Sequence, residues 1–90
     1  MSAEVRPQRA DGLEVHEVED GLVVYQSATD RVHYLNATAA VVFELCTGDN
    51  SERDIETLVA DAWDLPAPPH DEVQECLEQL RAEGLVTGNA

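Results

Sequence analysis

The sequence contains no lysine. Its basic residues are five arginines against 19 aspartates and glutamates, which gives a formal net charge of -14 at pH 7. Proteins that bind phosphate groups or anionic membranes use clusters of Lys and Arg, so this composition disfavours nucleic acid and membranes as partners. The same negative field favours cationic partners, and added salt should weaken that attraction.

Long apolar segments are also missing. No stretch approaches the roughly 20 residues of a membrane span, and residues 1–11 lack the apolar segment of a signal peptide. We therefore expect a cytoplasmic protein. Because residues 1–11 are polar, contain Pro7 and show no periodicity, the sequence predicts a flexible tail there and one domain over residues 12–87.

Cysteines and aromatic residues are few, with two cysteines and 4% aromatic residues. Cys46 and Cys76 occupy apolar positions of predicted helices, which is typical of small buried side chains in a reducing compartment and not of a disulfide. The core should be aliphatic, and its few large side chains are expected to be Phe43, Trp63, Tyr25 and Tyr34.

Motifs for chemistry are missing as well. The two cysteines and three histidines are not paired at the spacing of a metal site. No glycine-rich phosphate loop or nucleophile motif is present, and 90 residues leave little room for a catalytic cleft. The sequence predicts no catalytic residues, no metal and no cofactor, and hence a protein that is not an enzyme.

Three short segments have the composition of β-strands. Residues 13–18 partly alternate, and Asp20-Gly21 is a hairpin turn signal. Residues 22–27 are rich in β-branched and aromatic side chains, and residues 31–35 follow after a short connection. Together they predict an antiparallel meander.

The third strand leads directly into a helix, which limits how its side chains can point. Leu35 must be buried if that helix packs on the sheet. Because side chains alternate along a strand, His33 and Arg31 would lie on the side of Leu35, and Val32 and Tyr34 on the other.

Capping residues mark the first two helices. Asn36 is a good N-cap for a helix over residues 37–47, and Gly48 is placed to end it in a left-handed conformation. Ser51 caps the second helix, with Asp54 at the reciprocal position of a capping box. The side chains of the second helix that should face the core are Ile55, Leu58, Val59 and Ala62. Those that should face water are Glu52, Asp54, Glu56 and Asp61.

A proline-rich connector separates the second helix from the third. The third helix should begin near His70 or Asp71 and run to Glu83, before Gly84. Its apolar stripe consists of Val73, Cys76, Leu77 and Leu80. Three strands followed by three helices predict an α+β fold with the winged helix-turn-helix arrangement.

Two kinds of binding suit this arrangement. A winged-helix transcriptional regulator would act on DNA or on a DNA-binding protein, but the third helix is acidic and would be repelled by phosphates. Alternatively, an extended peptide could add to the free edge of the third strand, in a groove walled by a helix. Composition alone does not decide between peptide addition and an edge that charge merely protects.

The segment Leu35-Asn36-Ala37-Thr38-Ala39-Ala40, with Phe43, Leu45-Cys46 and Gly48 after it, resembles the PqqD-like family. The likeness runs from Leu22 to Val86. Members of this family are recognition elements for ribosomally synthesised and post-translationally modified peptides. They bind the leader of the precursor as an added strand against the third strand, beside the last helix, and present it to a processing enzyme.

The resemblance also implies a set of peptide contacts. On the strand these are Arg31, Val32, His33 and Tyr34. On the helix they are Val73, Leu77 and Arg81, with His70 and Gln74 on the same rim. The implied partners are a precursor leader peptide and a maturation enzyme, and acidic residues of the helix should steer Lys or Arg of the leader. The sequence departs at His33-Tyr34 from the pyrroloquinoline quinone member, which favours a lasso-peptide leader peptidase or a radical maturase as that enzyme.

Overall fold

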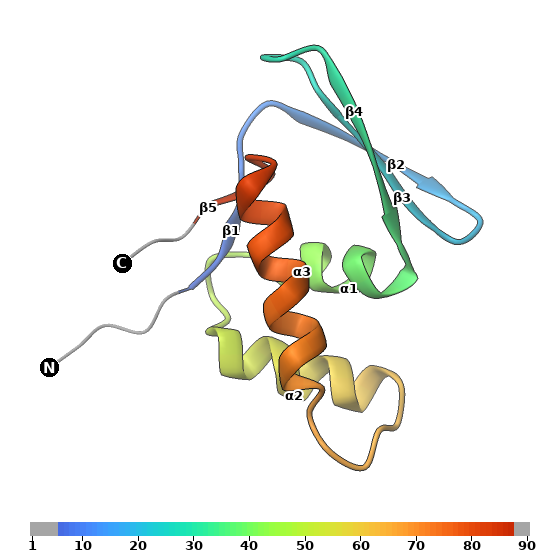
Figure 1. Ribbon diagram of the computed structural model, residues 1–90, viewed down its shortest axis with the longest axis vertical. Coiled ribbons are helices and arrows are strands. Elements are labelled where there is room, and N and C mark those ends of the chain that lie inside the picture. Colours follow the sequence, from blue (N-terminus) through green and yellow to red (C-terminus); the bar gives the residue numbers. More distant parts are fainter. Residues whose placement is uncertain (1–5, 88–90) are drawn as a thin grey trace, which may run out of the picture.

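The computed structural model describes residues 6–87, and its centre is a three-stranded antiparallel sheet. The strands are β2 (Leu13–Val18), β3 (Gly21–Gln26) and β4 (Arg31–Asn36), in the order β2-β3-β4 (Figure 1). The β2–β3 turn brings Gly21 opposite Asn36, where a Cβ atom on Gly21 would overlap the carbonyl oxygen of Leu35. Position 21 therefore requires glycine, because any side chain there would collide with β4.

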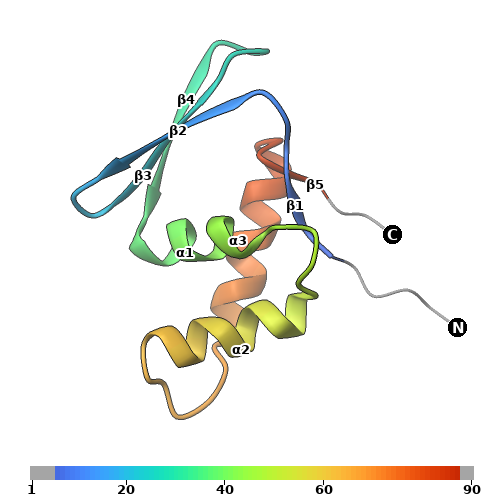
Figure 2. The same ribbon diagram turned by 180° about the vertical axis from the view of Figure 1, so that it is seen from behind.

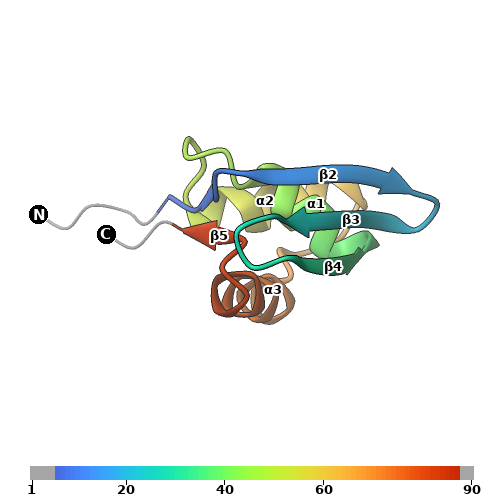
Figure 3. The same ribbon diagram turned by 90° about the horizontal axis from the view of Figure 1, so that it is seen from above.

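Three helices follow the sheet: α1 (Ala37–Leu45), α2 (Glu52–Ala62) and α3 (His70–Ala82). This order confirms the predicted α+β fold of three strands followed by three helices. Figure 3 shows the helices behind one face of the sheet, with α3 on the side of β4. None of the helices in residues 6–87 is long and apolar enough to span a membrane.

The predicted caps of α1 and α2 are confirmed. The side chain of Asn36 accepts a hydrogen bond from the backbone N–H of Ala39 at 2.9 Å, and Ser51 and Asp54 form a reciprocal capping box. Helix α1 is two residues shorter than predicted. It ends at Leu45 because Thr47 turns away to form a β-bridge with Gln8.

The core is aliphatic and lies between the sheet and the helices. Phe43 is its one fully buried aromatic side chain among the described residues. The predictions for Trp63 and Tyr34 as core residues are wrong, because they are 40% and 59% exposed. The buried cluster that links all layers comprises Leu22, Val24, Leu35, Ala40, Val42, Phe43, Cys46, Ile55, Val59, Val73, Leu77, Leu80, Leu85 and Val86.

Helix α2 is rotated relative to the predicted orientation. Leu58 is exposed, whereas Glu56, which was predicted to face water, is only 8% exposed. The carboxylate of Glu56 accepts a hydrogen bond from Gln74 on α3 at 3.1 Å and lies 2.8 Å from the ring of His70. These partners allow an acidic side chain to be buried between two helices.

Residues 6–11 do not form the predicted tail, whose first five residues lie outside the described part of the chain. Strand β1 (Gln8–Arg9) pairs with β5 (Val86–Thr87) at the other end of the chain (Figure 2). Pro7 is fully buried, and the backbone N–H of Arg9 donates to Cys46 at 2.9 Å. A two-residue strand has no periodicity, so the composition of this segment carried no signal of its pairing.

We expect removal of residues 1–10 to destabilise the domain. The deletion takes away three backbone hydrogen bonds that β1 and its flanks make to Cys46, Gly48 and Leu85. At about 1 kcal/mol for each bond, the free energy of unfolding should fall by about 3 kcal/mol, which corresponds to more than about 10 °C in Tm for a domain of this size. Thermal denaturation measures the effect. Removal of residues 1–5 leaves these bonds in place, and an equal loss from both deletions would contradict a stabilising role for β1.

Candidate functional site

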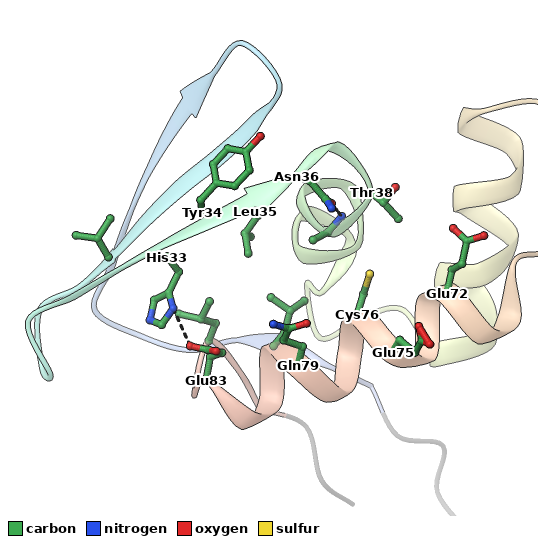
Figure 4. A pocket seen from close by; sticks show the side chains of 14 residues that line it. His33, Tyr34, Leu35, Asn36, Thr38, Glu72, Glu75, Cys76, Gln79 and Glu83 are labelled. Atoms are coloured by element: carbon green, nitrogen blue, oxygen red, sulfur yellow. Dashed lines mark hydrogen bonds and ion pairs between the residues drawn. The ribbon is translucent and has the colours of Figure 1, made fainter.

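A groove runs between β4 and α3. Its cavity has a volume of about 590 Å³. Residues 32–36 of β4 form one wall, residues of α3 form the other, and the start of α1 and Leu85 complete it (Figure 4). The helix wall and adjoining turn contribute Glu72, Glu75, Cys76, Gln79, Leu80 and Glu83.

Strand β4 offers a free edge to this groove. It pairs with β3 on one side, and no strand within residues 6–87 pairs with its other side. Backbone N–H and C=O groups of alternate residues point to that side and remain available to another strand. The six residues of β4 extend about 20 Å, and the 13 residues of α3 extend about the same length. The groove therefore has the length and the hydrogen-bonding groups for a short extended segment.

The opposite edge of the sheet, on β2, differs from the β4 edge because it is acidic. β2 carries Glu14 and Glu17 and is followed by Glu19 and Asp20, so charge discourages another strand from adding there. Strand β4 contains no acidic residue. Of the two edges, β4 is the one that combines a strand without acidic residues with a helical wall.

His33 closes one end of the groove. Its Nδ1 lies 2.8 Å from a carboxylate oxygen of Glu83, and its Nε2 lies 3.1 Å from the side-chain oxygen of Gln26. Both ring nitrogens therefore face oxygen atoms, and the ring can donate to both only when it is doubly protonated. The His33 side chain is 11% exposed, so this end of the groove is built from a side chain that is held in place from both sides.

Carboxylates dominate the other end. Glu72 and Glu75 lie on the exposed side of α3 along the groove (Figure 4). Within residues 6–87 neither of them makes an ion pair; the described ion pairs of acidic side chains involve Glu52, Glu56 and Glu83. Apolar lining residues that are buried or half-buried, among them Ala39, Cys76, Leu80 and Leu85, form an apolar floor, and the helix wall carries an uncompensated negative charge.

The thiol of Cys76 is part of that floor. Burial raises its pKa, and the nearby carboxylates of Glu72 and Glu75 raise it further. At neutral pH the side chain is therefore a neutral, weakly polar group that can contact an apolar side chain. Cys46 lies in the core with no exposed surface, and burial raises its pKa to about 12. Both cysteines are free, as the sequence predicts.

The structure brings three of the predicted site residues to the groove. Val32, His33 and Tyr34 line it, whereas Arg31 does not. From Val32 to Leu35 the alternation along β4 follows the predicted faces: Leu35 and most of the His33 side chain are buried, and Val32 and Tyr34 are 66% and 59% exposed. Arg31, which was predicted on the side of Leu35, is exposed.

The predicted helix contacts lie elsewhere. Val73 and Leu77 have no exposed surface and belong to the core, so they cannot reach a peptide in the groove. His70 and Gln74 contact Glu56 of α2. These four positions are on the faces of α3 that pack against the rest of the domain.

Arg81 joins α3 to α2 as well, because its guanidinium donates to Glu52 at 2.7 Å. Burial alone would raise the pKa of Glu52, but the hydrogen bond and the positive charge of Arg81 outweigh burial, and the pKa of this carboxyl is lowered. The arginine is therefore a structural partner of α2 in this fold. The face of α3 that lines the groove is instead the neighbouring one, with Glu72, Cys76 and Gln79.

Comparison with known proteins identifies the class to which this fold and groove belong. The family model described as coenzyme PQQ synthesis protein D (PqqD) matches residues 21–86, which is more than two thirds of the chain. The chain therefore belongs to the PqqD family, whose members are recognition elements that bind precursor peptides and work with maturation enzymes. No curated protein and no solved structure matches the chain. The match begins at β3, so β1 and β2 lie outside it.

Proposed function

We propose that this domain binds the leader segment of a ribosomally synthesised precursor peptide as a fourth strand on β4. The observation that supports this most directly is the unpaired edge of β4, which faces α3 across a groove of matching length. Backbone hydrogen bonds along the edge supply affinity, and pockets for alternate side chains supply specificity. The domain itself performs no chemistry on the peptide.

The bound leader is then presented to a processing enzyme. A lasso-peptide leader peptidase is our first candidate for this enzyme, and a radical maturase is the second. Because the groove between β4 and α3 holds only a short segment, residues of the precursor beyond the groove stay accessible to that enzyme. DNA is a poor alternative partner, since Asp71, Glu72, Glu75 and Glu78 give the exposed side of α3 a negative charge.

Amide hydrogen exchange tests the strand addition. Leader segments of precursor reading frames from the same genome can be synthesised and titrated at low salt. We expect saturable binding and slower exchange of the β4 amides that point to the groove, with little change in β2. Absence of saturable binding for every such leader would contradict the proposal, and protection of β2 in place of β4 would move the site to the other edge.

Alkylation of Cys76 gives a second test and a pH dependence. Only the thiolate reacts, and the raised pKa of Cys76 keeps most of it protonated at neutral pH. At pH values below that pKa, the rate of the reaction with iodoacetamide should therefore increase about tenfold for each unit by which the pH is raised. Cys46 should stay unmodified in the folded protein. Glu75→Gln removes one of the carboxylates that raise the pKa and should speed the reaction at a fixed pH.

A bound leader should cover Cys76 and slow the same reaction. Mass spectrometry after limited alkylation measures the modified fraction with and without the peptide. A rate that is independent of pH would contradict the raised pKa, and a rate that saturating peptide leaves unchanged would exclude the floor of the groove from the site.

A further inference from the structure

The charge of the groove points to the kind of strand that occupies it. We propose that the bound segment carries an Arg or Lys side chain that pairs with Glu72 and Glu75, and an apolar side chain two residues away that covers Cys76. This inference rests on the proposed function, because it assigns the ligand of the same groove. It makes α3 the element that selects among leaders.

The first argument is that the negative charge in the groove has no counterion in the protein. The described ion pairs leave Glu72 and Glu75 without a partner in residues 6–87. The chain has no lysine, and none of its five arginines lines the groove. Arg81, the one arginine on α3, is bonded to Glu52 on α2. A cation on a bound peptide would therefore meet no competing cation of the domain at these two carboxylates.

The second argument concerns the nature of that cation. Within residues 6–87 no group of three or more metal-ligating side chains converges, so a metal ion would find too few ligands. The two carboxylates stand beside the unpaired edge of β4, where the backbone of an extended segment can add. A guanidinium or ammonium group on such a segment reaches them from the strand, and the bidentate pairing of Arg suits two neighbouring carboxylates.

The third argument is the spacing. Side chains on one face of a strand repeat every two residues, or about 6.7 Å, and α3 advances about 6 Å in four residues. A strand side chain opposite Glu72 and Glu75 therefore has its next same-face neighbour opposite the stretch that holds Cys76, Gln79 and Leu80. Cys76 is half-buried and opens to the groove, whereas Leu80 is only 2% exposed, so that neighbour meets the thiol of Cys76.

The third position along the same face meets a different environment. The His33 ring already lies 2.8 Å from the carboxylate of Glu83 there, so the carboxylate at that end has a hydrogen-bond partner within the domain. The two ends of the groove therefore differ. The unpaired carboxylates lie toward the Asn36 end of β4, and the carboxylate of Glu83, which contacts His33, lies at the other end (Figure 4). A cation followed by an apolar side chain matches this order.

Selection from a random library tests the inference without a known leader. A phage-displayed library of random dodecapeptides is selected on three proteins: the natural chain, the double variant Glu72→Lys/Glu75→Lys, and the control Asp71→Lys/Glu78→Lys. Both variants change the net charge equally and each alters one residue in the first turn of α3. Asp71 and Glu78 are exposed and do not line the groove.

We expect the natural chain and the control to enrich peptides with Arg or Lys two positions from an apolar residue, and the groove variant to enrich Asp or Glu at that position. Synthetic peptides from the natural selection should bind the groove variant at least about tenfold more weakly than the control. Equal weakening of both variants, or the same peptides from all three proteins, would overturn the inference.

Cys76 alkylation separates this inference from the proposed function. Selected peptides that protect Cys76 but carry no cation would overturn the charge pairing and leave groove binding in place. Selected peptides that bind without protecting Cys76 would show that the groove is not the site, which overturns both. Protection of Cys76 by cationic peptides that the groove variant rejects supports both.

Discussion

Replacing Leu77 with aspartate should leave the domain unfolded. Leu77 has no exposed surface and packs in the cluster that joins α3 to the sheet and to α1. Truncation of such a leucine alone costs about 2–5 kcal/mol, and an unpaired buried carboxylate adds several more. A domain of this size has a total stability of about 5–10 kcal/mol. Circular dichroism should therefore show no cooperative thermal transition.

The control for this experiment is Leu77→Met, which keeps the volume of the side chain. It should cost less than about 1.5 kcal/mol and leave the fold intact. The contrary result would be a folded Leu77→Asp protein that has lost only peptide binding. That outcome would place the side chain in the groove and would restore the contact that the family resemblance implied.

Cys76 precedes Leu77 on α3, and replacing it with tryptophan should weaken peptide binding while the fold is kept. The domain should stay folded, because Cys76 is half-buried at the edge of the core and opens to the groove. The indole would fill the floor on which an added strand packs. Peptide affinity should fall by at least about thirtyfold, the factor that corresponds to the loss of about 2 kcal/mol at an interface hot spot.

Glu78→Trp is the matched control for this substitution. Glu78 is exposed on α3 and lies outside the groove, so the same bulky residue there should leave the affinity within about a factor of two, the effect of a neutral surface change. Fluorescence anisotropy with a labelled selected peptide measures both variants. Equal affinity of Cys76→Trp and the natural chain in folded protein would exclude a strand bound over Cys76.

The elements of this domain could be predicted from the sequence because their signals are local. Asn36 and the pair of Ser51 and Asp54 satisfy backbone groups within one turn, so their spacing alone identifies a helix start. Gly84 has a φ of 75°, which few residues other than glycine adopt without strain. Such features depend on three or four neighbouring residues and not on the rest of the chain.

The contacts that the sequence failed to predict are all long-range. Gln8 pairs with Thr87, and Glu56 is buried only because α3 brings His70 and Gln74 to it. The same dependence on distant residues explains why the sequence did not predict which residues of α3 line the groove. The stripe of Val73, Leu77 and Leu80 marks the core side of α3, but nothing local shows which flank meets α2 and which meets β4.

The pairing of β1 with β5 has a consequence for how the domain is made. The two strands hydrogen-bond across 79 residues of sequence, nearly the whole described chain. Contacts of such high sequence separation require the closure of a long loop and form slowly. During synthesis, Gln8 leaves the ribosome early and can meet Thr47 first, but its pairing with β5 is impossible until Thr87 has emerged. The domain therefore cannot complete its fold one layer at a time, and its first strand must wait for its last.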